Sequence, residues 1–320
     1  MIFNDLRFQK MNLIKEIKYE RKCWWCGNFA DSREHKIKQT DFSAMYGKGD
    51  LRKTSDAPFL VINGNSEERK IRQIQSSKSD WLKYEHNICE DCNTKKSRNF
   101  DIDYEIFSKY VLENVNNIIK TASIDFRKVF NCTDYLEHKK NVIKYYIKRA
   151  CCEISRPTEH NNCHEIADEV KQFLNNRGDI SYFNFEFQIK LPLLLLEQLI
   201  PNHKHISLHQ AIMYIFSNET GYRHAHHISS GYTYRWFSMN YIYCYDILKS
   251  QYLGYHEYYD SPILKVGIID SDKLPSLKGI TDNFEIKKIL ANCDIDINDE
   301  FGSSCSERLL NIDQFKEYYV

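Results

Sequence analysis

The pattern of hydrophobic and polar positions predicts both helices and strands along the chain. Apolar residues recur at helical spacing in 102–119 and again in 134–155, where Ile143, Ile147 and Ala150 would form a core face. From 183 to 191 they alternate strictly with polar residues, which is typical of a half-buried strand. These patterns together predict an α+β protein.

Less regular patterns predict the remaining elements. Expected helices cover 165–175, 208–216 (with Ser207 as its cap), 284–291 and 307–319, and residues 4–20 are expected to form a short amphipathic helix or an arm. Expected strands cover 59–62, 264–269 and one or two stretches within 231–248. Helices and strands are therefore mixed in the second half of the chain.

Length and composition favour two domains in a cytoplasmic protein. A chain of 320 residues is long for one domain, and we place a boundary near 125, which gives domains of 1–125 and 126–320. The longest apolar run, 191–200, contains Pro192, Glu197 and Gln198, so a membrane span is excluded on length. Charged residues interrupt the N-terminal segment, so no signal peptide is expected and the cytoplasm is the predicted compartment.

Charge is distributed unevenly between the two halves. Residues 1–150 carry 29 basic against 21 acidic residues (+8), and residues 151–320 carry 15 against 23 (−8). A basic half suits a phosphate backbone, because lysine and arginine contacts release counterions from DNA. The acidic half should not lie on DNA, and a sensing, regulatory, oligomerising or shielding role is expected for it.

Two CxxC pairs predict a structural zinc site. They are Cys23–Cys26 and Cys89–Cys92, with 62 residues between them. In a reducing compartment, two such turns are better explained by one tetrahedral zinc than by two disulfides. Zinc would hold strand and helix together in a module too small for a large core.

Further residues around these pairs resemble the HNH nuclease family in its four-cysteine form. Glu34-His35 follows the first pair, and Asn93 directly follows the second. The resemblance covers residues 20–110 and implies a ββα-metal fold. It also implies that His35 is the general base, that Glu34 and Asn93 hold a catalytic Mg²⁺ or Mn²⁺, and that the cysteines hold zinc. Asn87 is the nearest counterpart of the asparagine that orients the histidine in this family.

The chemistry of phosphodiester hydrolysis agrees with these roles. A base with a pKa near neutrality can activate water, and histidine meets this requirement. A divalent cation on the scissile phosphate absorbs developing negative charge, and Mg²⁺ prefers carboxylate and amide oxygens. The cations Lys95, Lys96 and Arg98 lie on the first helical turns after the second pair, where contacts with the DNA backbone are expected.

An insertion at about 46–80 separates the two halves of the predicted module. It is basic and rich in glycine and serine. It is expected either to grip the DNA backbone or to be a solvated charged excursion.

A second cluster of interest lies in the C-terminal half. Arg223, His224, His226, Arg235 and Trp236 combine cations with aromatic rings and could bind a nucleotide or another anion. The alternative is that this aromatic segment is simply a core strand.

The sequence thus predicts a metal-dependent DNA endonuclease in restriction or anti-phage defence. Its C-terminal domain would control it through a nucleotide or protein activator. One site cuts one strand, so double-strand cleavage would need a homodimer or a second encounter. Two alternatives remain: an inert zinc-stapled nucleic-acid-binding adaptor, and a nuclease for RNA or branched DNA.

Overall fold

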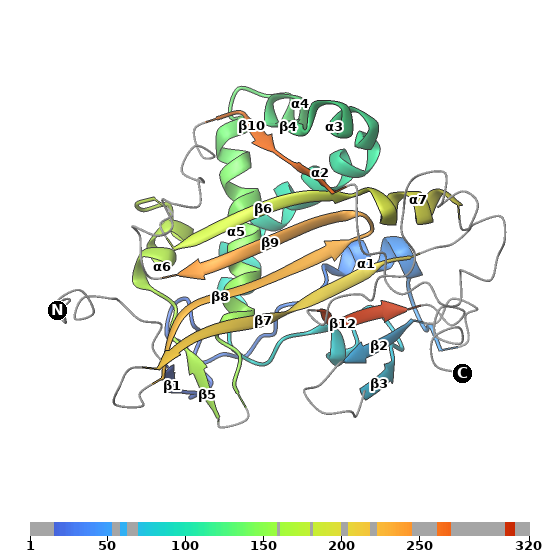
Figure 1. Cartoon of the computed structure of the whole chain (residues 1–320). Helices are drawn as coiled ribbons and strands as arrows, with labels where there is room; N and C mark the ends of the chain where they lie inside the picture. The colour runs from blue at the N-terminus through green and yellow to red at the C-terminus, as the bar shows by residue number, and fades with distance from the viewer. Residues whose placement is uncertain are drawn as a thin grey trace, which may run out of the picture.

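The fold is a large antiparallel sheet with one long helix across it, as seen in the computed structural model of the chain (Figure 1). The structure describes residues 16–52, 58–62, 70–158, 161–179, 182–199, 204–217, 223–244, 261–269 and 305–310. Within these, the eight strands of the sheet run in the order β11-β6-β9-β8-β7-β12-β2-β3. Its neighbours are antiparallel except for β11 and β6.

The sheet combines four long strands of the C-terminal half with four short strands, of which two come from the insertion. The long strands are β6 (Phe183–Lys190), β7 (Ile206–Ser217), β8 (Arg223–Tyr234) and β9 (Phe237–Cys244). The short ones are β2 (Phe59–Ile62), β3 (Lys70–Gln73), β11 (Gly267–Ile269) and β12 (Cys305–Leu310). The inserted segment therefore extends the sheet through β2 and β3.

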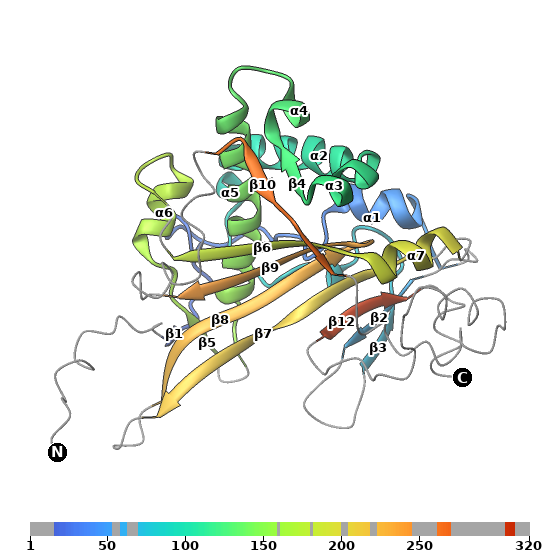
Figure 2. The same ribbon diagram turned by 45° about the horizontal axis from the view of Figure 1, so that its top comes forward.

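Helix α5 (Tyr135–Ile154) is the middle layer of the molecule (Figures 1 and 2). Fifteen of its twenty residues are buried. Tyr146 packs edge-on against Phe187 of the sheet, while the neighbouring Tyr145 stacks on Tyr104 of α2 (Arg98–Glu113) at 3.8 Å between ring centroids. The predicted core face is confirmed, but the remaining faces of this helix are buried as well.

Five charged residues of α5 are buried, and each has a partner on a neighbouring segment, as buried polar groups require. Lys139 donates to the Ser261 carbonyl, Lys144 to Asn176, Lys148 to Asp101 and Ser97, and Arg149 to the Lys36 carbonyl, while Glu153 accepts from Ser230 and Tyr241. These polar contacts connect α5 to both layers.

The remaining elements surround this centre. Helices α1 (Gln39–Tyr46), α3 (Val115–Thr121), α4 (Phe126–Phe130), α6 (Asp168–Leu174) and α7 (Leu191–Leu199) accompany two small antiparallel pairs. One pair joins β1 (Glu16–Lys18) to β5 (Asn162–His164), and the other joins β4 (Ser123–Asp125) to β10 (Ile263–Lys265). Among the described residues, no helix has the length and apolar character needed to cross a membrane.

Most of the predicted elements are confirmed. The 102–119 helix is present as α2 and α3, interrupted at Asn114, and the helices at 134–155 and 165–175 are α5 and α6. The strands expected at 59–62, 183–191 and within 231–248 are β2, β6 and the β8–β9 hairpin. The stretch 264–269 belongs to two short strands, β10 and β11. The α+β class is therefore confirmed.

Three predicted helices are wrong where the structure describes them. Residues 208–216 lie in β7, which pairs with β8 along its length and with β12 at 206–209, so Ser207 belongs to a strand instead of capping a helix. Residues 307–310 lie in β12, and 16–18 form β1. In each case pairing with another strand outweighed the local pattern. The helix predicted at 284–291 and the rest of 4–20 and 307–319 lie outside the described residues.

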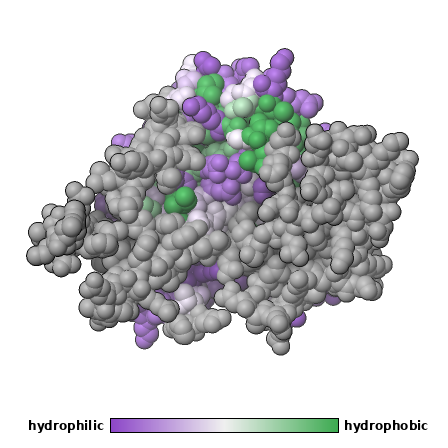
Figure 3. Space-filling view, in the orientation of Figure 1, coloured by the Kyte–Doolittle hydropathy of each residue, from purple (hydrophilic) through white to green (hydrophobic). Residues whose placement is uncertain are grey.

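Buried apolar side chains form one large cluster, which extends from Cys23 to Val266. A smaller cluster packs α1 against β2, β7 and β8. The predicted boundary near 125 falls within the large cluster, and the two-domain division remains a prediction. On the face shown in Figure 3, hydrophobic residues gather at the helical end of the molecule.

Candidate metal centre and the adjoining hairpin

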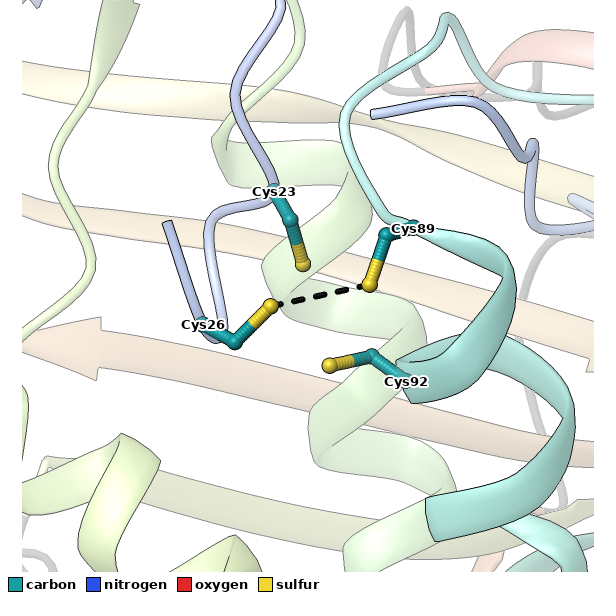
Figure 4. Close-up of side chains that lie close together, drawn as sticks. All are labelled: Cys23, Cys26, Cys89 and Cys92. Carbon is teal, nitrogen blue, oxygen red and sulfur yellow. Dashed lines mark hydrogen bonds between the residues drawn. The ribbon is translucent and has the colours of Figure 1, made fainter. Parts of the chain in front are cut away.

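The four cysteines of the two CxxC pairs converge on one point (Figure 4). Their sulfur atoms all lie within 4.8 Å of one another, and the Sγ atoms of Cys26 and Cys89 are 3.6 Å apart. Zinc–sulfur bonds of about 2.3 Å in a tetrahedron place sulfurs about 3.8 Å apart. The donor set and its dimensions therefore fit one zinc ion, as the sequence predicted.

The loops that carry the cysteines are tight turns. Gly27 has a φ of 79° and donates its N–H to the Cys23 carbonyl at 2.8 Å, a conformation that favours glycine. In the second pair, Asp31 accepts the N–H of Glu90 at 2.7 Å, at the start of the π-helical segment Asp91–Lys96. A residue from the first loop thus fixes the helix that carries Cys92.

The electrostatics of the cluster call for a cation. A hydrogen bond from the Cys92 thiol lowers the pKa of Cys23 to about 5, and the same bond raises the pKa of Cys92. Within the pair, the Cys23 thiol therefore ionises more readily than the Cys92 thiol. Zinc binds thiolates and would stabilise all four in that form.

The tryptophans of the first turn belong to the core. Trp24 and Trp25 are buried and stacked, and Trp25 also stacks on Phe100. Trp24 Nε1 donates to Cys152 Sγ of α5 at 3.3 Å. The cysteine cluster therefore rests on α5, which lies behind it in Figure 4.

Two extended segments run antiparallel beside the cluster. Ser32 pairs with Ile88 and His35 with Lys83, and Lys36 N–H donates to the Leu82 carbonyl at 2.7 Å. The second segment leads directly into Cys89 and the helical residues 91–96. The local order is thus extended segment, inserted residues, extended segment and helix, with the cysteines at one end.

His35 is half-buried on the first of these segments. Its Nε2 is buried without a hydrogen-bond partner among the described residues. Burial lowers the pKa of His35, although the Glu34 carboxylate acts in the opposite direction. The neutral imidazole, which can accept a proton, is therefore favoured at neutral pH.

Glu34 is engaged in a buried ion pair that the sequence did not predict. Its side chain is 7% exposed, and its Oε2 lies 2.9 Å from Nζ of Lys148, which is 1% exposed. Lys148 also lies 3.2 Å from Asp101 Oδ2. Burial opposes the charge of this lysine, but the two carboxylates raise the pKa of Lys148. The negative charge of Glu34 is thus balanced by a lysine of the same chain.

The two asparagines have different surroundings. Asn93 donates its Nδ2 to Ser32 Oγ at 3.1 Å, and its Oδ1 is buried without a partner among the described residues. Asn87 donates to the Cys152 carbonyl at 2.6 Å and to Ser155, both at the end of α5. Asn87 therefore anchors the hairpin to α5 through these hydrogen bonds. A role for Asn87 in orienting His35 remains a prediction.

These residues fit a second, catalytic cation only in part. Asn93 offers a free oxygen, but Glu34 already faces an ammonium group. A divalent ion bound at Glu34 would have to displace Lys148 from a buried position. Glu34 and Asn93 therefore fit Mg²⁺ or Mn²⁺ less well than the four cysteines fit zinc.

The other predicted site residues are spread over the surface and the sheet. Lys95, Lys96 and Arg98 are exposed, with Lys95 paired to Asp91 and Lys96 placed 5.9 Å from the centroid of the Trp25 ring. Arg235 is paired with Glu197, and Trp236 is 1% exposed in the core. Arg223, His224 and His226 belong to β8, and their side chains lie outside the description. The ligand pocket remains a prediction.

Sequence reasoning missed Lys148, Asp101 and Arg149, which lie beneath the hairpin. In the sequence, all three have the pattern that is typical of exposed charged residues on amphipathic helices. One feature of the sequence could have indicated that this helix is buried on all sides. Lysine and aromatic residues occur on every face of 135–154, so the helix has no wholly polar side. Comparisons with protein-family models, curated proteins and solved structures find no match to this chain.

Proposed function

We propose that this protein is an HNH-type endonuclease that hydrolyses DNA phosphodiester bonds beside a structural zinc site. The observation that carries the proposal is the hairpin stapled by the cysteine cluster, with His35 on its first segment and Asn93 at the start of the following helix. This order of elements supports the resemblance in sequence. The unpartnered Nε2 of His35 gives it a chemical role.

In this mechanism His35 accepts the proton of the attacking water. Burial lowers the pKa of His35, so the basic form is available at neutral pH. The free Oδ1 of Asn93 can accept a hydrogen bond from that water or another ligand. The backbone pairing of His35 with Lys83 holds the ring on a rigid element, which favours a fixed reaction geometry.

The exposed cations Lys95, Lys96 and Arg98 would contact the phosphate backbone next to the cut. The acidic C-terminal half would keep the nuclease controlled, through a nucleotide or protein activator, in a defence setting. Cleavage of both strands would proceed through a homodimer or two encounters. RNA and branched DNA are further substrates to compare in the same assay.

The alternative function is a zinc-stapled nucleic-acid-binding adaptor without activity. The Lys148–Glu34 pair favours it, because the carboxylate expected to hold a catalytic cation is already occupied. The two functions differ in whether His35 is needed for cleavage.

Cleavage of a supercoiled plasmid tests the proposal. Wild type, His35→Ala and His86→Ala are compared, since His86 lies on the other hairpin segment and is a matched control. Loss of a general base slows such reactions by about 10²–10⁴-fold. We expect this loss in His35→Ala and a rate within about two-fold of wild type in His86→Ala.

The role of a second cation is measured in the same assay. The zinc-loaded protein is dialysed free of other divalent ions, and Mg²⁺ or Mn²⁺ is added back, because EDTA would also strip the zinc. Nicking by His35→Ala at the wild-type rate would contradict the proposed site. Binding of DNA without cleavage under every condition would favour the adaptor.

A further inference from the structure

An open hollow lies between α1 and the turn 75–78. It has a volume of about 1040 Å³ and is lined by two runs of sequence, 39–52 and 75–78. Most of its described lining residues have polar side chains, with Lys48, Arg52 and Lys78 as cations and Asp50 as an acid. Hydroxyl and amide side chains, among them Thr40 and Gln39, supply further hydrogen-bonding groups.

The walls of this hollow are fixed to one another. Leu51 N–H donates to the Gln75 carbonyl at 2.8 Å, and Gln39 Nε2 lies 3.3 Å from Ser77 Oγ. Leu51 and Ile74 are buried in the small apolar cluster. The polar surface is therefore a shaped part of the fold.

The lining carries a surplus of positive charge. Arg52 is paired with Asp50 through both carboxylate oxygens, with Nη2 at 2.6 Å from Oδ2. Lys48 and Lys78 are exposed, and neither has an ion-pair partner among the described residues. Among the described lining residues, three cations and one acid give a net charge of +2, with one lysine from each of the two runs lacking an ion-pair partner.

Both walls continue into the hairpin that carries His35. Helix α1 starts shortly after His35, and the 75–78 turn leads through the short 3₁₀ turn Asp80–Leu82 to Lys83, which pairs with His35. Arg33 holds this connection by donating to Asp80 Oδ1 at 2.8 Å. A strand lying in the hollow would therefore extend toward the hairpin.

We propose that this hollow binds the phosphodiester backbone of the DNA strand, next to the cleavage point. The inference rests on the proposed function and deepens it by assigning the insertion as a substrate-binding wall. Free lysines on opposite walls suit successive phosphates, and hydroxyl and amide groups suit phosphate oxygens. Small-molecule pockets of about 300–1,000 Å³ enclose most of their ligand, whereas this hollow is open and suits a polymer.

An exposed tryptophan stands at the hairpin end of the same wall. Trp81 is 46% exposed, and the Arg72 guanidinium lies 5.3 Å from its ring centroid. An exposed aromatic ring beside a cation is a platform on which an unpaired base can stack. We therefore expect the hollow to hold a single strand more tightly than a duplex.

DNA binding by the full-length, zinc-loaded protein tests this proposal. Fluorescence anisotropy is measured with labelled single-stranded and double-stranded 20-mers, without Mg²⁺ or Mn²⁺, over a range of salt. The variant Lys48→Gln/Lys78→Gln is compared with Lys109→Gln/Lys128→Gln, which removes the same charge from exposed positions of α2 and α4. Zinc content and melting temperature serve as folding checks.

Each phosphate contact contributes a slope of about 0.7–0.9 to the dependence of log K on log salt. The hollow variant should lose about 1.4–1.8 of that slope and bind about ten- to fifty-fold more weakly at 0.1 M salt. The control variant should keep the wild-type slope. Trp81→Ala should weaken binding of the single strand more than that of the duplex.

The outcomes separate this proposal from the proposed function. Equal affinity and slope in the hollow variant and wild type would overturn the hollow as a binding surface, even if His35→Ala abolishes cleavage. A wild-type protein that binds neither oligonucleotide would also overturn it. Selective weakening in the hollow variant would support it, even in a protein that never cuts.

Discussion

The cysteine cluster and the Glu34 site lie side by side on α5, yet the negative charge at each site is balanced by a different kind of cation. Four sulfurs converge within 4.8 Å of one another, in dimensions that fit one zinc ion. Glu34 instead faces Lys148 at 2.9 Å, with Asp101 beside the same lysine. One site needs an ion from solution, whereas the other receives its cation from the chain.

This difference shows what a ligand pattern in sequence can and cannot specify. The CxxC spacing brings the donors of each pair together within a few residues, so each half of the metal site is local. The ion-pair partner of Glu34 is a lysine more than a hundred positions away. A residue that matches a metal-binding motif therefore binds metal only if the rest of the fold leaves it available.

The largest expected effect comes from removing a zinc ligand. Wild type should contain one zinc per chain by mass spectrometry, and Cys92→Ser should lose most of it. Structural zinc contributes on the order of 10 kcal/mol in small zinc modules, so the variant should unfold at a much lower temperature. Cys132→Ser, which changes an exposed thiol, is the control. If Cys92→Ser kept its zinc and melted at the wild-type temperature, the cysteine cluster would not need a metal ion, and the contrast with the Glu34 site would be lost.

A smaller loss is expected when the internal cation is removed. Lys148→Met leaves Glu34 and Asp101 without their buried partner, and breaking such a pair costs about 3–5 kcal/mol. Adding Glu34→Gln should restore part of this loss, which urea unfolding of the two single variants and the double variant would measure. Lys139→Met changes a buried lysine whose Nζ donates to the neutral Ser261 carbonyl, and it should cost less. A loss below about 1 kcal/mol in Lys148→Met would show that Glu34 does not depend on this lysine.

The smallest effect concerns a buried acid that is bound by a hydroxyl group. Tyr104 donates to Asp41 at 2.6 Å, and burial raises the pKa of Asp41 to about 6. Because the folded state holds this proton more tightly than the unfolded chain, stability falls as pH rises through 6. Between pH 5 and 7.5 this one group should cost about 1–1.5 kcal/mol.

Urea unfolding of Asp41→Asn and wild type at the two pH values measures this contribution. The variant should lose less stability than wild type on going from pH 5 to 7.5. Asp179→Asn, at an exposed position, should follow wild type. Identical pH profiles for Asp41→Asn and wild type would mean that the Tyr104 hydroxyl stabilises the charged form of the buried Asp41 as well as a lysine would.

The features that could be predicted from the sequence are those set by near neighbours. The spacing of Cys23, Cys26, Cys89 and Cys92 predicted their convergence, and strict alternation predicted β6. Residues 208–216 have a pattern compatible with a helix, but they form β7, because β8 pairs along the strand and β12 adds pairing at 206–209. The burial of α5 on every side could not be predicted either, since its charges resemble those of a solvated helix and are paired only by distant segments.

The position of α5 also sets an order of events during synthesis. Both cysteine pairs leave the ribosome before α5 does, and the long strands of the sheet follow later still. Zinc can therefore bind a nascent chain in which Trp24 still lacks Cys152 and Glu34 still lacks Lys148. During that interval Glu34 would be open to solvent cations, and the arrival of α5 would end the competition in favour of Lys148.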